Sequence, residues 1–335
     1  MTGDCIEKQL SLIPAAAPPE LAELAEIGNA QIAESIPDNT RRAYSNDLNS
    51  FTTWAASHGL EVLPAAPQTV RLYIIALDQE GKKPATIARR LSSIAKAHRL
   101  KGFLSPIDPA VKEQLAAIHR TRGTAQDKAR PLLIDDLKKI VNKTKPDVIG
   151  TRNRALLLLG FSAALRRSEI AALDISDLEF VDEGLIVHIR RSKTDQAAKG
   201  ETIAIPKLPD EAARFCAIRA VSNWLAVAAI DSGPLFRGLG RAGRNVFFCD
   251  IRPGRLNTKT INNIVKAMCK AAGINPDPYS AHSLRAGWAT EAARVGLELP
   301  YLMQHTRHRS TRIAAGYIRE SNGFRCNPLQ MLFCR

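Results

Sequence analysis

The stretches AHSLRAGWATEAARVG, residues 281–296, and RHRSTRIAAGYIRE, residues 307–320, decide what this chain can be. They carry two histidines, an arginine and a tyrosine in a fixed order: His282, Arg285, His308 and Tyr317. A tyrosine hydroxyl is a poor nucleophile at its ordinary pKa of about 10. It needs a proton acceptor and fixed cations that stabilise the group it attacks. This set of side chains suits attack on a phosphodiester and few other reactions.

The stretch ALRRSEIAAL, residues 164–173, adds an arginine and a carboxylate. We expect a helix over 166–173, on which Arg166 and Glu169 share one face, three positions apart. The Glu169 carboxylate would then hold Arg166 toward the protein body, while Arg167 faces solvent. Taken alone, an ordinary surface Arg–Glu pair is the better explanation of this pattern.

The stretch RRSKTDQ, residues 190–196, adds Lys193. Alternating apolar residues predict strands at 184–190 and 201–206, which would place Lys193 on the loop of a β-hairpin. A solvated lysine is the usual finding at a loop tip. The alternative is a general acid that reaches into a cleft.

Charge and length narrow the function further. The 335 residues suggest two domains, and a net charge of +14 points to a polyanionic partner. Residues 1–37 contain six acidic residues and one lysine, so an acidic leader precedes a strongly basic body. Six cysteines without a CxxC pair, no signal-peptide pattern and no long apolar run indicate a reduced, cytoplasmic protein without a membrane segment.

The predicted organisation has five parts. We expect a flexible leader (1–37), a helical domain (38–122), a polar linker (123–132), a catalytic domain (133–320) and an apolar tail (321–335). Within the helical domain, four helices should begin near Asn39 or Thr40, at Pro67, at Pro84 and near Asp108. In the catalytic domain, helices are expected at 134–143, 151–164, 166–173, 209–230, 258–272, 282–295 and 311–319.

Two of these helices carry the candidate DNA contacts. Helix 84–100 has basic side chains on the sides expected to be exposed: Arg89, Arg90, Lys96, His98 and Arg99. The helix near 257–270 offers amides and lysines: Asn257, Lys259, Asn262, Asn263 and Lys266. Solvated helix faces explain both sets equally well. The DNA contacts should be mostly to phosphates, with affinity that falls steeply with salt.

Taken together, the order Arg, Glu, Lys, His-x-x-Arg, His, Tyr closely resembles the tyrosine recombinase (phage integrase) family over residues 38–320. The resemblance is nearest to the two-domain, Cre-like members. It implies a mainly α fold with a small β-sheet, in which a helical SAM-like core-binding domain precedes an α+β catalytic domain.

The resemblance also implies the role of each residue. Tyr317 attacks the scissile phosphate to form a 3′-phosphotyrosine, and a Holliday junction follows. Arg166 and Arg285 bind the non-bridging oxygens, and His308 adds a hydrogen bond. Lys193 protonates the leaving 5′ oxygen. The other two residues assist, with His282 moving the tyrosine proton and Glu169 orienting the site. Arg167 and His305 are neighbouring candidates for Arg166 and His308, but the nine-residue spacing to Tyr317 favours His308.

No cofactor and no metal are expected, because fixed cations can supply the charge stabilisation that metals supply elsewhere. The expected partners are double-stranded DNA with an inverted-repeat site and three further copies of the chain, a tetramer on two DNA sites. The apolar tail would dock on a neighbouring copy. Two alternatives stay open, a type IB-like topoisomerase that uses the same residues and a DNA-binding regulator with an inactive site.

Overall fold

The computed structural model describes residues 38–123, 129–190, 200–241 and 249–322, together with the pairs 23–24 and 27–28. The chain divides into two compact units, residues 1–127 and 128–335. The division falls inside the linker expected at 123–132. Most of the acidic leader, the loop that carries Lys193 and all but two residues of the tail lie outside the described residues.

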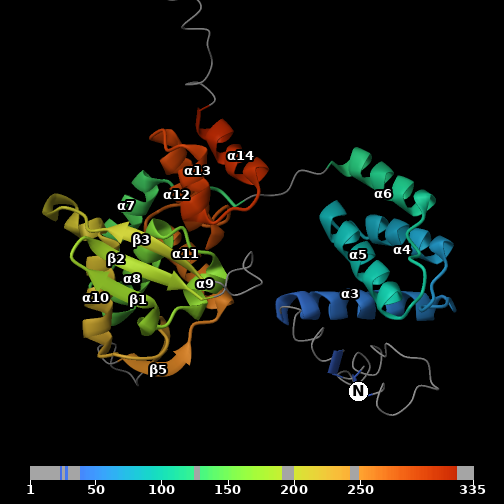
Figure 1. The fold of residues 1–335 in the computed structure, drawn as a ribbon, viewed down its shortest axis with the longest axis horizontal. Helices are drawn as coiled ribbons and strands as arrows, with labels where there is room; N and C mark the ends of the chain where they lie inside the picture. The colour runs from blue at the N-terminus through green and yellow to red at the C-terminus, as the bar shows by residue number, and fades with distance from the viewer. Residues whose placement is uncertain are drawn as a thin grey trace, which may run out of the picture. The chain divides into compact units, whose positions relative to one another are not determined.

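The N-terminal unit is built from helices (Figure 1). In its described part they are α3 (Asp38–Ser57), α4 (Pro67–Gln79), α5 (Pro84–Leu100) and α6 (Pro109–Arg122). Proline opens three of them, because its fixed φ suits the first helical turn and its missing N–H would lack a partner there anyway. Apolar side chains such as Phe51, Ile74 and Ile94 pack between the helices. All four predicted helices are present, although the first begins at Asp38, slightly earlier than expected.

A buried carboxylate ties α3 to α5. Asp47 accepts hydrogen bonds from Arg89 Nη1 at 2.6 Å and from the Ser93 hydroxyl at 2.8 Å. Arg90 lies 3.8 Å from the same carboxylate. Arg90 also donates to the hydroxyl of Tyr73 on α4. We call this set the Asp47 cluster, and it joins three helices of the N-terminal unit.

His98 corrects one expectation. Sequence placed it on an exposed side of its helix, but it is 1 % exposed. Its Nε2 accepts from the backbone N–H of Ala65 at 2.8 Å, while Nδ1 donates to the carbonyl of Ile94. A neutral imidazole can accept a hydrogen bond at Nε2 and donate one from Nδ1 at the same time. His98 is therefore a core residue that anchors the loop before α4.

The catalytic unit is a helical body with two small antiparallel sheets (Figure 1). Its described helices, 3₁₀ turns included, are α7 (Ile134–Asn142), α8 (Val148–Ser162), α9 (Arg167–Ala172), η1 (Ile175–Asp177), η2 (Asp210–Phe215), α10 (Ala217–Ala228), α11 (Thr258–Ala271), α12 (His282–Arg294), α13 (Leu299–Thr306) and α14 (Thr311–Asn322). The predicted helix 209–230 is wrong as one element. It breaks at Cys216, whose extended ψ of 118° separates η2 from α10.

The described strands form two antiparallel sheets. Strand β2 (Gly184–Ile189) pairs with β1 (Leu178–Val181) on one side and with β3 (Glu201–Pro206) on the other. The strands β4 (Arg237–Arg241) and β5 (Cys249–Arg255) form the second sheet. The β2–β3 hairpin was expected, whereas β1, β4, β5 and the helix α13 were not. The mainly α fold with small sheets is confirmed.

The core of the catalytic unit holds α12, and hence Arg285, in place. Helix α8 is buried on nearly every side because of its run Leu156–Leu159, and it packs against α10 and α12. Gly287 of α12 lies so close to Leu132 that an added Cβ would be 1.9 Å from the Leu132 carbonyl oxygen. Leu132 also donates its N–H to the Ser283 carbonyl at 2.9 Å. Only glycine permits this approach.

Candidate active site

Arg166 is fixed by the carboxylate of Glu169. It occupies the position just before α9 rather than the first turn, and so corrects the expected helix by one residue. Its backbone N–H donates to Glu169 Oε2 at 2.8 Å and its Nη1 donates to Oε1 at 2.6 Å. Glu169 is buried and Arg166 is 16 % exposed, whereas Arg167 lies in solvent. The carboxylate therefore holds one arginine toward the protein interior, as the spacing predicted.

Arg285 lies in the first turn of α12 and is 1 % exposed. Its Nη1 donates to the carbonyl of Ala164 at 2.9 Å, while Nη2 finds no protein acceptor in the described part of the chain. Burial first, and then the charges of Arg166 and Arg307, lower the pKa of Arg285 to about 9. A buried donor without an acceptor is costly, and an anion would relieve that cost.

The Ala164 carbonyl that receives Arg285 belongs to an unusual turn. Ala164 has φ of +47° and is fully buried, directly after α8. A non-glycine residue in the left-handed region persists only where its surroundings fix it. The conformation aims the Ala164 carbonyl at two guanidinium groups, because Arg307 Nη2 also donates to it at 3.2 Å.

His308 and Tyr317 face one another. Their ring centroids are 5.9 Å apart with planes 25° from parallel, and both residues are half-buried. His308 follows α13 and Tyr317 lies in α14, a helix that packs on α12 and α13 (Figure 1). The charge of Tyr317 also acts on the pKa of Arg285 in the direction opposite to burial. The phenol, the imidazole and the buried guanidinium therefore belong to one site.

The tautomer of His308 follows from its neighbour Thr306. The Thr306 hydroxyl lies 2.6 Å from the carbonyl of Leu302, which can only accept, so its single hydrogen is committed there. The same oxygen is 2.8 Å from His308 Nδ1, so Nδ1 of the neutral ring must carry the hydrogen. Neutral His308 thus presents the lone pair of Nε2, and it donates from Nε2 only when protonated.

The site carries more positive than negative charge. Burial and the neighbouring arginines lower the pKa of His308 to about 4 and also lower the pKa of His282, the exposed first residue of α12. Against Arg166, Arg285 and Arg307 stand the carboxylate of Glu169 and, at the edge, that of Glu201. Such a surplus of fixed cations beside a tyrosine is suited to a phosphate.

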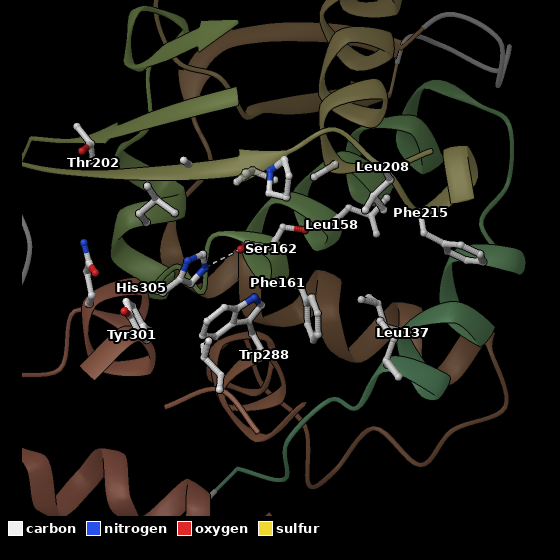
Figure 2. A pocket seen from close by; sticks show the side chains of 18 of the residues that line it. Leu137, Leu158, Phe161, Ser162, Thr202, Leu208, Phe215, Trp288, Tyr301 and His305 are labelled. Carbon is white, nitrogen blue, oxygen red and sulfur yellow. Dashed lines mark hydrogen bonds between the residues drawn. The ribbon is translucent and has the colours of Figure 1, made fainter. Parts of the chain in front are cut away.

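His305, the alternative to His308, is held elsewhere. Its ring stacks on Trp288 at 3.8 Å between centroids, and Nε2 lies 2.8 Å from the Ser162 carbonyl, as Figure 2 shows. Burial lowers the pKa of His305 to about 4, with further lowering by Arg307 and Arg285. Of the two histidines, His308 is the one whose ring stacks with Tyr317.

Two further residues, Lys193 and Arg307, differ in how the sequence prediction treated them. Lys193 lies outside the described residues, although the β2 and β3 strands that flank its loop are in register up to Ile189 opposite Glu201. Arg307 was missed. Its only sequence signal was a charged residue directly before His308.

No metal site is visible in the regions the structure covers, where no three His, Cys, Asp or Glu side chains gather in the manner of a metal centre. In the same regions, no helix has the length and apolar character needed to cross a membrane.

Comparison with known proteins identifies the family. The model of the phage integrase family matches residues 131–323, and that of the phage integrase N-terminal SAM-like domain matches residues 30–101. The chain belongs to the phage integrase family. The resemblance inferred from the motifs is therefore confirmed, and this family member is a tyrosine recombinase, an enzyme of site-specific DNA recombination.

Individual relatives agree. The integrase/recombinase XerD homologue of Selenomonas ruminantium is 35 % identical over 90 % of this chain and 88 % of its own length. The Cre recombinase of Escherichia phage P1 is 24 % identical over 85 % of each chain. Among solved structures, XerH bound to its palindromic difH substrate has a TM-score of 0.58 at 17 % identity, with 93 % of this chain and 81 % of that chain covered. A lambda integrase dimer on its core site has a TM-score of 0.56 at 19 % identity, covering 90 % and 95 %.

The candidate DNA-contacting side chains of this integrase's N-terminal unit differ in how far they are already engaged in contacts within the protein. Arg89 and Arg90 bond within the Asp47 cluster, and Arg90 is only 16 % exposed. Lys96 lies 5.1 Å from the ring centroid of Tyr44. Arg99 is exposed. Arg99 is therefore the member of this set best placed to meet a phosphate, and the DNA contact itself stays a prediction.

Around α11, several candidates serve the integrase fold. Asn257 caps the helix by accepting from the Thr260 N–H at 2.7 Å. Asn262 accepts from the backbone N–H of Ala281, directly before His282, and Lys266 donates to a carbonyl in the same loop. Lys259 and Asn263 are exposed. Asn262 and Lys266 thus hold the loop that leads into the active-site helix.

Proposed function

We propose that this integrase cleaves and rejoins DNA through a 3′-phosphotyrosine at Tyr317 and exchanges strands through a Holliday junction. The observation that carries the proposal is the buried Arg285, whose Nη2 lacks a protein acceptor among the described residues and whose site holds surplus positive charge beside Tyr317. A scissile phosphate between these groups would satisfy the guanidinium and place phosphorus within reach of the phenol.

In the proposed reaction, the Tyr317 oxygen forms a bond to phosphorus while the bond from phosphorus to the 5′ oxygen breaks. Arg166 and Arg285 hold the non-bridging oxygens with their planar donor forks. The tyrosine proton passes toward His282, and the leaving 5′ oxygen takes a proton from Lys193. The ester conserves the energy of the phosphodiester, so a 5′-hydroxyl from another strand can reverse the step without ATP.

His308 can act in two ways in this scheme, as a proton acceptor and as a hydrogen-bond donor. In the neutral form its Nε2 lone pair can accept a proton, because Thr306 fixes the hydrogen on Nδ1. A bound phosphate would raise the pKa of His308 and turn Nε2 into a donor toward a phosphoryl oxygen. Glu169 acts through Arg166, which it orients by two hydrogen bonds.

We also propose a tetramer on two DNA sites that contain inverted repeats. The tail after α14 is rich in apolar residues, namely Phe324, Leu329, Met331, Leu332 and Phe333. The catalytic unit has a cavity of about 640 Å³ lined by side chains such as Leu137, Phe161, Phe215, Trp288 and Tyr301 (Figure 2). Tyr301, one of the lining residues, is 59 % exposed. The tail of a neighbouring copy would fill the cavity and close a cyclic assembly.

Covalent trapping tests the proposed chemistry. Wild type and Tyr317→Phe are incubated in EDTA with a library of randomised nicked duplexes, and adducts that survive SDS are sequenced. We expect adducts only with wild type, enriched for an inverted repeat. Adducts without sequence enrichment would instead support a topoisomerase, and tight binding without any adduct would indicate a DNA-binding regulator.

A further inference from the structure

Arg307 is a buried arginine in a place that normally suits glycine. It follows the last residue of α13, its φ is +55°, and its side chain is 2 % exposed. Left-handed helix ends favour glycine or asparagine, because a Cβ crowds the following carbonyl there. A charged side chain at such a position is costly twice, through its backbone and through its desolvation. The rest of the site must offset both costs.

The guanidinium of Arg307 meets acceptors on three sides. Its Nη2 donates to Glu169 Oε2 at 2.8 Å. Toward the turn after α8, it donates to the carbonyls of Ala163 and Ala164 at 3.3 and 3.2 Å. Its Nη1 also reaches the carbonyl of His305 at 3.2 Å, which closes the end of α13.

The backbone of Arg307 contributes as well. Its carbonyl accepts from Arg166 Nη2 at 3.1 Å. Arg307 therefore holds Arg166 in two ways. Its backbone carbonyl accepts directly from Arg166, and its side chain binds the same Glu169 carboxylate that binds Arg166. Arg285 is held through the Ala164 carbonyl that Arg307 also contacts, and His308 is the next residue in the chain.

We propose that Arg307 is a positioning residue for strand cleavage, which fixes Arg166, Arg285 and His308 relative to one another without touching DNA. This inference rests on the proposed function of the same site. Because the side chain is buried, Arg307 acts only through the groups it holds. Removal of the guanidinium should therefore misplace three phosphate-binding groups together while leaving the DNA-facing surface intact.

Electrostatics support the same role. Burial alone would raise the pKa of the Glu169 carboxyl, but Arg307 and Arg166 hold it below its ordinary value. Arg285 also interacts with this carboxylate, and the titratable groups that interact with Arg166, Arg285 or Arg307 include His282, His305, His308, Tyr317 and Glu201. Without Arg307, Glu169 would keep a single strong partner, and Arg166 would be held less firmly.

Two variants separate positioning from folding. Arg307→Gly removes the guanidinium and suits the backbone, and Arg307→Lys keeps the charge but loses the planar fork. Ala229→Gly is the control, because Ala229 ends α10 with φ of +50° far along the chain from the site. Each protein is mixed with the nicked duplex selected by trapping wild type. Its affinity and its single-turnover rate of covalent adduct formation are measured separately.

We expect Arg307→Gly to slow adduct formation about 100-fold at saturating DNA. Affinity should stay within about threefold of wild type, because the misplaced groups act mainly on the transition state. Millimolar guanidinium should restore part of the rate in Arg307→Gly, and Ala229→Gly should match wild type. Should Arg307→Gly fail to fold, Arg307→Lys carries the test, with an expected loss of about tenfold.

Three results would overturn the inference. One is a folded Arg307→Gly, or a folded Arg307→Lys, with the wild-type rate. A second is a loss of rate that, in both variants, merely follows loss of affinity or of folded protein. In both cases the wild-type adduct would still stand, so the proposed function would survive. The third is the absence of any adduct with wild type, which would overturn the proposed function together with this inference.

Discussion

Two buried ionic clusters, one in each unit, are built from the same residue types but have different roles. In the Asp47 cluster, one carboxylate meets Arg89 and Arg90, and Nη1 of Arg90 donates to two hydroxyl groups. In the catalytic unit, Glu169 meets Arg166 and the deeply buried Arg307. The first arrangement joins helices, and water can solvate its extra positive charge because the Arg89 side chain is 46 % exposed.

The second arrangement adds a third guanidinium without a carboxylate of its own. Arg285 rests on the Ala164 carbonyl and keeps an Nη2 that no protein group of the described chain accepts. A buried ion pair is therefore weak evidence of function, and the surplus beside it is the informative feature. A surplus cation that is fully buried, such as Arg285, predicts an anionic ligand, whereas a surplus charge that water can reach, as at Arg89, predicts no ligand.

Arg285→Ala should give the largest effect on chemistry. We expect adduct formation at saturating DNA to fall about 10³-fold, because one transition-state donor is lost. Thermal stability should hold or rise, since the change removes an uncompensated buried cation. Single-turnover trapping measures the rate of adduct formation, and thermal melting of the same samples measures the stability. A stable variant with the wild-type rate would break the contrast between the two clusters.

Asp47→Ala should show the opposite pattern, with lower stability and a nearly unchanged rate of adduct formation. Loss of a buried carboxylate that pairs with two arginines should lower the free energy of unfolding by about 3 kcal/mol. Once folded and saturated with DNA, the variant should form adducts within about twofold of the wild-type rate, because the proposed chemistry involves residues of the other unit. Urea unfolding and trapping at low temperature measure the two quantities. An Asp47→Ala protein as stable as wild type would contradict the assignment of this cluster to stability.

The burial of His305, with a further contribution from Arg307 and Arg285, also predicts a pH dependence of stability. Its pKa is lowered to about 4 in the folded protein, whereas an unfolded histidine titrates near 6.5. The folded state therefore binds fewer protons, and stability is lost as pH falls from about 6.5 to 4. The share of His305 should be about 2 kcal/mol, since its ring is partly exposed and solvent screens part of the effect.

The measurement compares wild type with His305→Gln by urea unfolding at pH 7, 5.5 and 4.5. The glutamine amide can still donate to the Ser162 carbonyl but does not titrate. Wild type should lose stability more steeply than His305→Gln over this range. Parallel curves would show that the folded state does not lower the pKa of His305.

Thr306→Val should give the smallest effect. Valine keeps the shape of threonine but removes the oxygen that receives Nδ1–H of His308. The ring is then free to change tautomer, and we expect adduct formation to slow about tenfold. Thr306→Ser should keep the wild-type rate. A Thr306→Val enzyme as fast as wild type would show that the tautomer of His308 is not fixed by this hydroxyl.

Local signals explain what the sequence predicted well. Pro67, Pro84 and Pro109 mark the first turns of three helices, and the alternation in β2 and β3 identified their hairpin. The hydrogen bonds between Arg166 and Glu169 were also predictable, because the two residues are three apart. Each of these features depends on neighbours within a few positions.

The features that were missed depend on distant parts of the chain. Glu169 lies 138 residues before Arg307, so no local pattern announces their ion pair. His98 was assigned to an exposed side because its role depends on Ala65, 33 residues away. The short helix α13 opens with Leu-Pro, and β4 and β5 contain glycine and proline without clean alternation. Propensity and spacing cannot register such contacts.

The most direct test of the central claim is to identify the residue and the bond in the covalent adduct. Wild-type protein is trapped on a nicked duplex in EDTA, digested with protease and nuclease, and the modified peptide is sequenced by mass spectrometry. The account predicts a nucleotide joined through its 3′-phosphate to Tyr317. Attachment at another residue, or through a 5′-phosphate, would contradict it.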